Sequence, residues 1–109
     1  MTANGGIKYD DGKPDHSLHP PIALEEIAKV WSFGQRKYQA FNWSKGFLWR
    51  RPAAAALRHI TAWLRGEDLD PESGYSHLAH AACCLMMLLH FQATNTGTDN
   101  RMGKETEES

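Results

Sequence analysis

The sequence predicts an all-α domain with three main helices. Apolar residues recur at intervals of three and four in three segments, each long enough for several helical turns. Turn-forming residues separate these segments, and no stretch shows the alternating pattern of a β-strand. The 109 residues suffice for one modest core. We therefore expect a single helical domain over residues 1–93, of which 1–21 form an extended arm, and a disordered polar tail over residues 94–109.

The first helix is predicted from Ile22 to about Gln39. Three glycines and three prolines make residues 1–21 rich in turns, and Pro20-Pro21 suits the start of a helix because proline is tolerated in the first turn. The apolar positions that follow approximate a helical stripe: Ile22, Leu24, Ile27, Ala28, Trp31 and Tyr38.

The second and third helices follow a connector at residues 42–46. The second is predicted from about Pro52 to Arg65, where Gly66 ends it, and we expect it to bury Ala53, Ala56, Leu57, Ile60 and Leu64. The third is predicted from about Gly74 to Gln92, with Leu78, Ala81, Ala82, Leu85, Leu88 and Leu89 inside.

The third helix is apolar on nearly all sides between Ala79 and Leu89. One three-helix unit offers too little surface to cover such a helix. A partner subunit would cover the rest, so we expect a homo-oligomer; a monomer that buries this helix by itself is the alternative.

Charge and cysteine content exclude several classes of function. The net charge of -1 gives no attraction to DNA, RNA or an anionic membrane. No apolar run is long enough to span a bilayer and the first residues do not resemble a secretory signal, so we expect a cytoplasmic location. Cys83 and Cys84 are adjacent and cannot staple distant segments, which indicates reduced thiols in the core.

The segment 66–80 carries the strongest functional signal. Four carboxylates fall at Glu67, Asp68, Asp70 and Glu72, and such crowding favours a bound cation. His77 and His80 follow at i and i+3 on one helix face, and imidazoles shift the preference from Mg²⁺ towards Mn²⁺. A divalent metal in a small helical protein points to phosphate chemistry. The alternative is a solvated acidic loop beside two structural histidines.

Cations and aromatic rings that suit a nucleotide occur elsewhere in the chain. Lys13 lies in a turn, and Lys37 lies near the end of the first helix. The rings of Trp43 and Trp49 either stack on a base or cap the small core, and the sequence leaves both interpretations open.

Several motifs together resemble a known family. They are Lys8-Tyr9-Asp10-Asp11-Gly12-Lys13-Pro14, Pro20-Pro21, Phe33-Gly34-x-x-Lys37-Tyr38, Asn42-Trp43-x-x-Gly46, Leu57-Arg58-His59, Gly66-Glu67-Asp68-x-Asp70-Pro71-Glu72-Ser73-Gly74 and His77-Leu78-Ala79-His80. Over about residues 7–90 the chain resembles the phage-associated dATP/dGTP diphosphohydrolase domain, which is related to MazG-like all-α nucleoside-triphosphate pyrophosphatases.

The resemblance implies hydrolysis of dATP or dGTP to the monophosphate and pyrophosphate with Mg²⁺ or Mn²⁺. It also implies a MazG-like helical bundle completed by homo-oligomerisation, and a phage-encoded protein in the host cytoplasm. The expected partner is a purine deoxynucleotide, not a nucleic acid polymer or a membrane. The chain departs from MazG-type enzymes, which present Glu-x-x-Glu and Glu-x-x-Asp on successive helices, where this chain has Arg58-His59 and His77-x-x-His80.

Metal ligation is therefore expected from the 67–72 loop together with a histidine, or else from a differently placed acid such as Glu26. We expect the metal ligands to be Glu67, Asp70, Glu72 and His77, and the catalytic residues to be Glu67, His77 and His80. The expected substrate-binding residues are Lys13, Lys37, Asn42, Trp43, Arg58 and His59.

Two hypotheses from other classes compete with the enzyme. Absence of the paired acidic motifs favours a nucleotide-binding protein that sequesters its ligand without catalysis. A helical interaction module whose acidic loop is merely solvated is the third interpretation.

Overall fold

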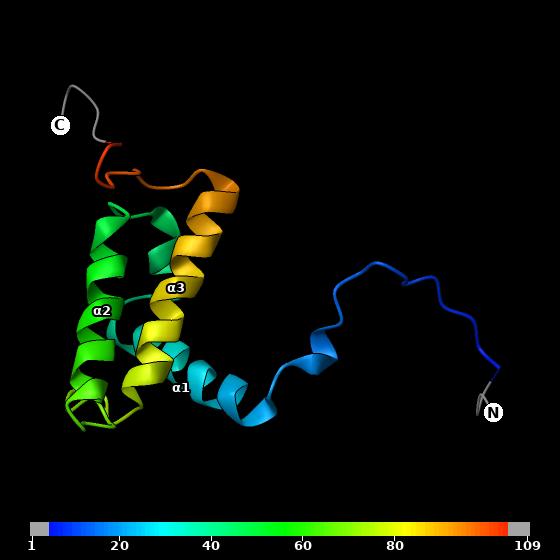
Figure 1. Cartoon of the computed structure of the whole chain (residues 1–109), viewed down its shortest axis with the longest axis horizontal. Helices are drawn as coiled ribbons and strands as arrows, with labels where there is room; N and C mark the ends of the chain where they lie inside the picture. The colour runs from blue at the N-terminus through cyan, green and yellow to red at the C-terminus, as the bar shows by residue number, and fades with distance from the viewer. Residues whose placement is uncertain (1–4, 105–109) are drawn as a thin grey trace.

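The computed structural model describes residues 5–104 and contains three α-helices: α1 (Pro21–Lys37), α2 (Arg50–Leu64) and α3 (His77–Thr94) (Figure 1). Two short 3-10 helices, η1 (His16–Leu18) and η2 (Asn42–Lys45), lie in the connections. Extended pairing within residues 5–104 is limited to two isolated bridges, Leu48 with Thr98 and Leu69 with Ser76. The predicted all-α class with three main helices is confirmed.

Local side-chain chemistry sets the helix ends. Pro21 occupies the first position of α1, as expected from Pro20-Pro21. Ser76 caps α3, since its side chain accepts a hydrogen bond from the amide of Leu78, and Asn95 ends α3 in a left-handed conformation with φ 53°. Helix α3 therefore begins three residues after the predicted Gly74, because residues 74–76 belong to the preceding loop.

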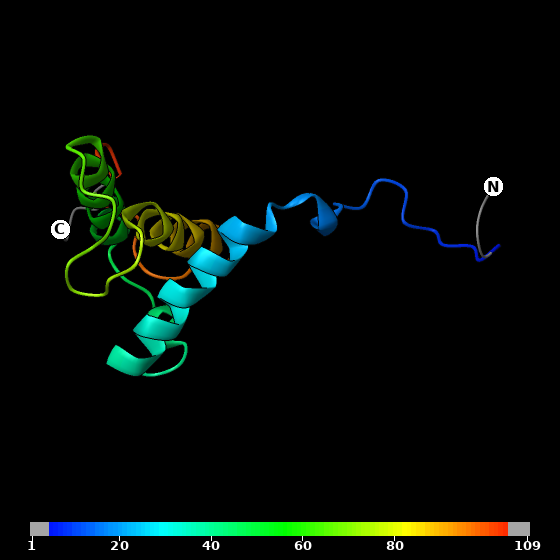
Figure 2. The ribbon, with the colours of Figure 1, turned by 90° about the horizontal axis from the view of Figure 1, so that it is seen from below.

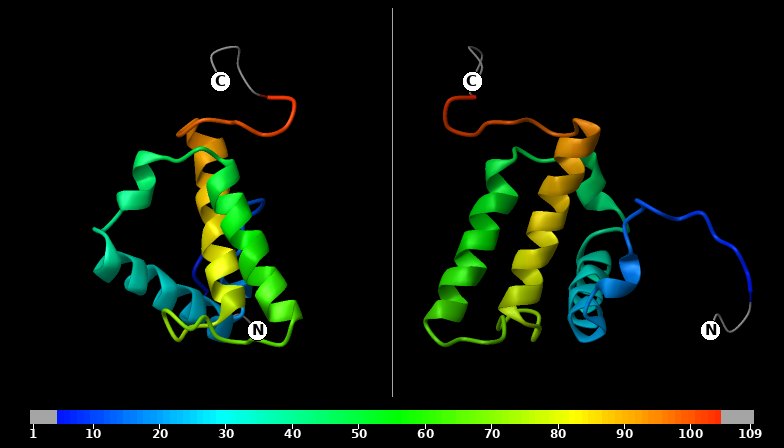
Figure 3. Two further views of the ribbon diagram at one scale, coloured as in Figure 1. Left: turned by 90° about the vertical axis from the view of Figure 1, so that its left-hand side faces the viewer. Right: turned by 45° about the vertical axis from the view of Figure 1, so that its right-hand side comes forward.

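The helices form a layer with α3 in the middle. Helices α2 and α3 run antiparallel and side by side, and α1 crosses α3 on its other side (Figure 3). The turn between α2 and α3 lies at the same end of the molecule as the part of α1 that packs on α3 (Figure 1). This end carries the acidic loop.

Two small apolar groups hold the layer together. Val30 of α1 packs with Ala79 and Cys83 of α3. At the far end of α3, Phe91 is completely buried, with ring centroids 6.2 Å from Trp43 and 6.1 Å from Phe47. The residues that α2 buries are small, namely Pro52, Ala56 and Ala62, which permits its backbone to approach α3 closely.

Trp43 belongs to this second group, and Trp49 is buried at the start of α2. The Trp43 ring lies 5.4 Å from Trp31 and 4.9 Å from His90 by centroid distance. Trp49 is buried, and its Nε1 donates to the carbonyl of Thr96 at 2.8 Å. Of the two interpretations left open, the structure favours core packing for both rings.

The prediction of a disordered tail from residue 94 is wrong for residues 94–104, which are ordered against the helices. Thr94 still belongs to α3, and the chain then returns across the start of α2. The amide of Trp49 donates to the carbonyl of Thr98 at 2.9 Å, and the Asn100 side chain accepts from the Arg50 amide at 3.0 Å. Backbone hydrogen bonds therefore hold this segment in place, although its polar composition indicated no ordered structure. Residues 105–109 lie outside the described residues.

Residues 5–20 extend away from the three helices, and all of them are exposed (Figure 2). This arm lengthens the molecule to 59 × 37 × 28 Å. It agrees with the expected extended arm; residues 1–4 lie outside the described part.

The apolar faces of α2 and α3 differ from those predicted. Leu57 is 64% exposed, Leu64 70% and Leu89 66%, although the sequence pattern predicts that each is buried. The predicted burial of Ala56 and Ala81 is confirmed, and Ala62 and Ala79, for which burial is not predicted, are buried as well. Closely packed helices bury small residues at their contact, so the spacing of large apolar residues alone does not identify the buried face. Within the described chain, no helix is long and apolar enough to cross a membrane.

Candidate functional site

The loop between α2 and α3 is held by a dense set of hydrogen bonds. The Asp70 side chain accepts from the amide of Glu72 at 2.8 Å, and the Asp70 amide donates to the carbonyl of Tyr75 at 2.8 Å. The amide of His77 donates to the carbonyl of Asp68 at 3.0 Å. The acidic segment is therefore a structured turn that fixes the Asp70 carboxylate near the first turn of α3.

His77 is the centre of a row of titratable side chains. Its Nε2 lies 2.7 Å from Oε1 of Glu67, and its Nδ1 lies 2.8 Å from Nδ1 of His59. His77 is buried, whereas the Glu67 side chain is half exposed. Helix α2 thus supplies one histidine, α3 another, and the loop a carboxylate.

The order of these groups indicates where the protons lie. An ionised carboxylate only accepts hydrogen bonds, so Nε2 of His77 donates to Glu67. With Nε2 donating, Nδ1 of His77 carries a lone pair, which accepts the N–H at Nδ1 of His59 unless a cation takes its place. This tautomer leaves Nε2 of His59 with a lone pair.

His80 forms a second pair with the loop. Its Nε2 lies 2.7 Å from Oγ of Ser73 and 3.5 Å from Oδ2 of Asp70. Its ring stacks on His59, with centroids 4.6 Å apart and planes 11° apart. The ring of Phe33 from α1 packs against His80 in a T-shaped arrangement, at a centroid distance of 6.2 Å. All three helices therefore contribute to this group.

Burial lowers the pKa of His59, and repulsion between His59 and His80 when both are protonated lowers it further. Burial also lowers the pKa of His80, against the opposing influence of Asp70. Both imidazoles are consequently neutral at pH 7, which is the form that accepts a proton or binds a metal.

Three of these side chains have the geometry of a metal site. His59, Asp70 and His77 each offer a ligand atom, and the three atoms lie within 4.8 Å of one another. A metal-binding histidine commonly donates its other ring N–H to a carboxylate, and His77 does so to Glu67. Two imidazoles and one carboxylate suit Mn²⁺ or a similar transition ion better than Mg²⁺. The donor set therefore fits the expected divalent metal.

The structure brings together most of the residues predicted around the metal. Asp70, His77 and His80 meet, together with Glu67, which contacts Nε2 of His77. Glu72 lies apart from the group: its exposed carboxylate pairs with Nζ of Lys37 from α1.

The other expected substrate residues lie further away. Lys13 is on the exposed arm, and Glu26, considered as a distant ligand, pairs with Lys29. Asn42 and Trp43 lie in η2, where Trp43 packs on Phe91 at the opposite end of α3. Arg58 is exposed on the flank of α2, one residue before His59.

Two contributions are not evident from the sequence motifs. The sequence predicts that His59 binds substrate, whereas in the structure its Nδ1 contacts Nδ1 of His77. An antiparallel arrangement of the second and third helices is the sequence-based expectation from which this contact could have been predicted. Ser73 has no predicted role, yet its hydroxyl holds His80 and accepts from the amide of Tyr75 at 3.1 Å. No feature of the sequence distinguishes Ser73 from an ordinary turn serine.

The two thiols show no sign of nucleophilic chemistry. Burial raises the pKa of Cys83 to about 12 and also raises the pKa of Cys84. A buried, protonated thiol is inert, in agreement with the core role predicted for this pair.

Acidification should destabilise the metal-free protein through His59 and His80. An unfolded histidine binds its proton near the ordinary pKa of 6.5, whereas both folded histidines bind theirs only at lower pH. Protonation therefore favours the unfolded state as the pH falls below about 6.5. We expect the Tm in EDTA to fall between pH 7.5 and 5.5, and to fall less in His80→Gln. An equal fall in the variant and the parent would exclude His80 as a source.

Comparisons with known proteins place the chain in a family. Residues 3–101 match the family described as dATP/dGTP diphosphohydrolase, N-terminal. A protein of Salmonella phage PMBT28, named dATP/dGTP diphosphohydrolase, is 38% identical over 96 residues, which cover 88% of this chain. The chain spans 33% of the length of that relative. No solved structure matches. The chain therefore belongs to the dATP/dGTP diphosphohydrolase N-terminal family.

Proposed function

We propose that this chain hydrolyses purine deoxynucleoside triphosphates, dATP or dGTP, to the monophosphate and pyrophosphate with a divalent metal. The observation that supports this most is the convergence of His59, Asp70 and His77, with ligand atoms within 4.8 Å of one another. The name of the phage relative supplies the substrate class. The metal would be held by these three side chains, with Glu67 orienting His77.

The chain's own residues divide the remaining work. A bound divalent ion would polarise phosphate oxygens and lower the pKa of an attacking water. His80, neutral at pH 7 because burial lowers its pKa, can accept the proton of that water at Nε2. Ser73 orients this nitrogen from 2.7 Å, and the Asp70 carboxylate would stabilise the imidazolium that forms.

Incubation of dATP and dGTP with the pure protein, followed by anion-exchange chromatography, tests the proposal. We expect deoxynucleoside monophosphate and pyrophosphate with Mn²⁺, slower release with Mg²⁺, and intact substrate with EDTA. His59→Gln should remove the activity, whereas the matched change His19→Gln on the exposed arm should not. Equal turnover in the parent and in His59→Gln would exclude the proposed site.

A nucleotide-binding role without catalysis is the second candidate. It is favoured by the length of the phage relative, of which this chain spans 33%. A domain of that size can bind a nucleotide while another part of a longer protein performs the chemistry. Binding of dATP by calorimetry, combined with intact substrate under every metal condition, would favour this candidate.

We also propose that the chain forms a homo-oligomer. Helix α3 has no charged side chain other than histidine, yet Leu78, Leu85, Met86 and Leu89 are each about half exposed or more. A second copy would cover this surface. Light scattering coupled to gel filtration should give at least twice the 12.3 kDa chain mass, and Leu85→Glu with Leu89→Glu should lower it towards the chain mass. A monomer in the unaltered protein would contradict this.

A further inference from the structure

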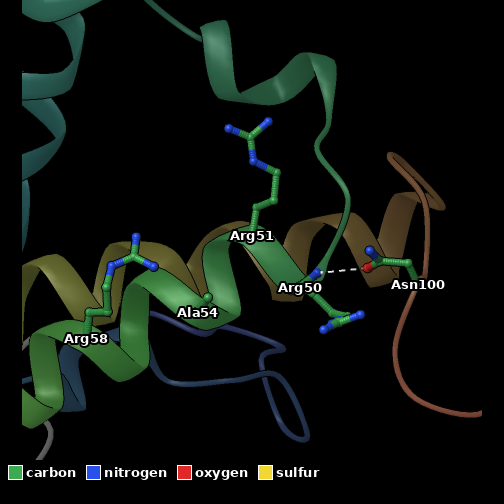
Figure 4. Close-up of a pocket in the computed structure, with 5 residues that line it drawn as sticks. All are labelled: Arg50, Arg51, Ala54, Arg58 and Asn100. Atoms are coloured by element: carbon green, nitrogen blue, oxygen red, sulfur yellow. Dashed lines mark hydrogen bonds between the residues drawn. The ribbon is translucent and has the colours of Figure 1, made fainter.

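One flank of α2 carries an open cavity of about 370 Å³ lined by Arg50, Arg51, Ala54, Arg58 and Asn100 (Figure 4). A second cavity of about 290 Å³ continues along the helix, lined by Leu57, Arg58, Thr61 and Arg65. Arg58 borders both cavities, and we call the two cavities together the arginine groove. Figure 4 shows the Arg51 and Arg58 side chains directed to the same side of α2.

The polar lining of the arginine groove consists mostly of hydrogen-bond donors. Guanidinium groups carry five donors and no acceptor, and no carboxylate lines either cavity. The Asn100 Oδ1 already accepts from the Arg50 amide at 3.0 Å, which leaves its NH₂ group as the free end. None of the ion pairs found within residues 5–104 involves Arg50, Arg51, Arg58 or Arg65.

The spacing of the arginines indicates an extended anion. Arg51 and Arg58 are seven residues apart on the helix, a rise of about 10 Å. A single phosphate is compact, whereas linked phosphates spread their charge along a chain and offer oxygens to two guanidinium forks at once. We propose that the arginine groove binds an oligophosphate of two or more linked phosphate groups through Arg51, Arg58 and Asn100.

The oligophosphate has two possible sources, a nucleoside triphosphate or free polyphosphate. Arg58 directly precedes His59, so the middle of the groove lies about a quarter-turn of α2 from the histidine and carboxylate group. A triphosphate tail that left that group would enter the groove at Arg58. Assignment of the ligand to a nucleotide rests on the proposed function; binding of an oligophosphate does not.

Calorimetry in EDTA tests the groove without any contribution from hydrolysis. The probes are tripolyphosphate, inorganic phosphate, dATP and dAMP at low ionic strength. We expect tripolyphosphate and dATP to bind at least tenfold more tightly than phosphate and dAMP. Arg51→Gln and Arg58→Gln should each weaken tripolyphosphate about tenfold. Lys45→Gln removes one positive charge from the exposed end of η2 and should leave binding unchanged.

Several results would overturn the inference. Equal affinity for phosphate and tripolyphosphate would indicate general attraction to anions, and unchanged affinity in both arginine variants would place the ligand elsewhere. If Lys45→Gln weakened tripolyphosphate binding as much as the arginine variants do, the loss of affinity would be explained by net charge alone. Absence of hydrolysis with intact, arginine-dependent tripolyphosphate binding would refute the proposed enzyme and support the groove. Circular dichroism of each variant controls for folding, and Arg58→Lys should recover part of the affinity.

Discussion

Replacing Asp70 with asparagine should lower the turnover of dATP by at least about 100-fold, because a metal supplies several kcal/mol of transition-state stabilisation and each tenfold in rate corresponds to about 1.4 kcal/mol. The change removes the negative charge from the set formed with His59 and His77. Asparagine keeps an oxygen that can accept from the amide of Glu72, so the loop should keep its shape. Mn²⁺ affinity, measured by calorimetry without nucleotide, should fall together with turnover.

Asp68→Asn is the matched control for this variant. Asp68 lies two residues before Asp70 in the same loop and is exposed, and only its backbone carbonyl contacts His77. Turnover and Mn²⁺ affinity should remain within about twofold of the parent, as is usual for exposed surface positions. An equal loss in both variants would mean that the loop acts only through its overall negative charge, and that Asp70 is not a specific ligand.

The helices were predictable because their signals are local. Pro20-Pro21 at the start of α1 and the apolar spacing of α2 and α3 indicate helices without any knowledge of the tertiary structure. The direction of each helix face depends on its neighbours and was predicted only in part, because Leu57 and Leu64 were expected to be buried together with Ala56. Ala56 and Ala62 face α3 because small side chains permit a close approach, while Leu57 and Leu64 remain outside.

The sequence predicted the location of the site more accurately than the role of each residue in it. Four carboxylates followed by two histidines indicate cation chemistry, and Asp70, His77 and His80 do converge. The sequence does not show which carboxylate turns inward. The amide of Glu72 fixes Asp70, and Lys37 from another helix holds Glu72 outside, so both orientations depend on contacts that form only after folding.

The segment after α3 shows the limits of composition. Thr96, Gly97 and Thr98 resemble a solvated tail, yet they contact Phe47 and Trp49 through backbone atoms. Backbone hydrogen bonds leave no trace in composition, because every residue other than proline carries the same donor and acceptor. Gly97 is the one position of this segment where the absence of a side chain is required.

Gly97→Ala should lower the free energy of unfolding by about 2–4 kcal/mol, in the range of strongly destabilising substitutions. Gly97 has φ +75°, a conformation that costs an L-residue about 1 kcal/mol or more. A Cβ at this position would also overlap the Phe47 carbonyl oxygen and lie 3.1 Å from the Phe47 amide nitrogen. The new methyl group would have to displace backbone, so the segment would separate from Trp49 and uncover its indole. Urea denaturation followed by tryptophan fluorescence measures both effects.

Gly66→Ala separates the two causes of this loss. Gly66 also has a positive φ, +96°, but apart from its chain neighbours no heavy atom of the described chain lies within 4 Å of the position that an alanine methyl group would take. Its replacement carries the conformational cost alone, about 1 kcal/mol. A distinctly larger loss at Gly97 would therefore measure the contact between residues 96–98 and the start of α2. Equal losses would mean that this contact contributes little, and that the segment after α3 is free to leave the helices in solution.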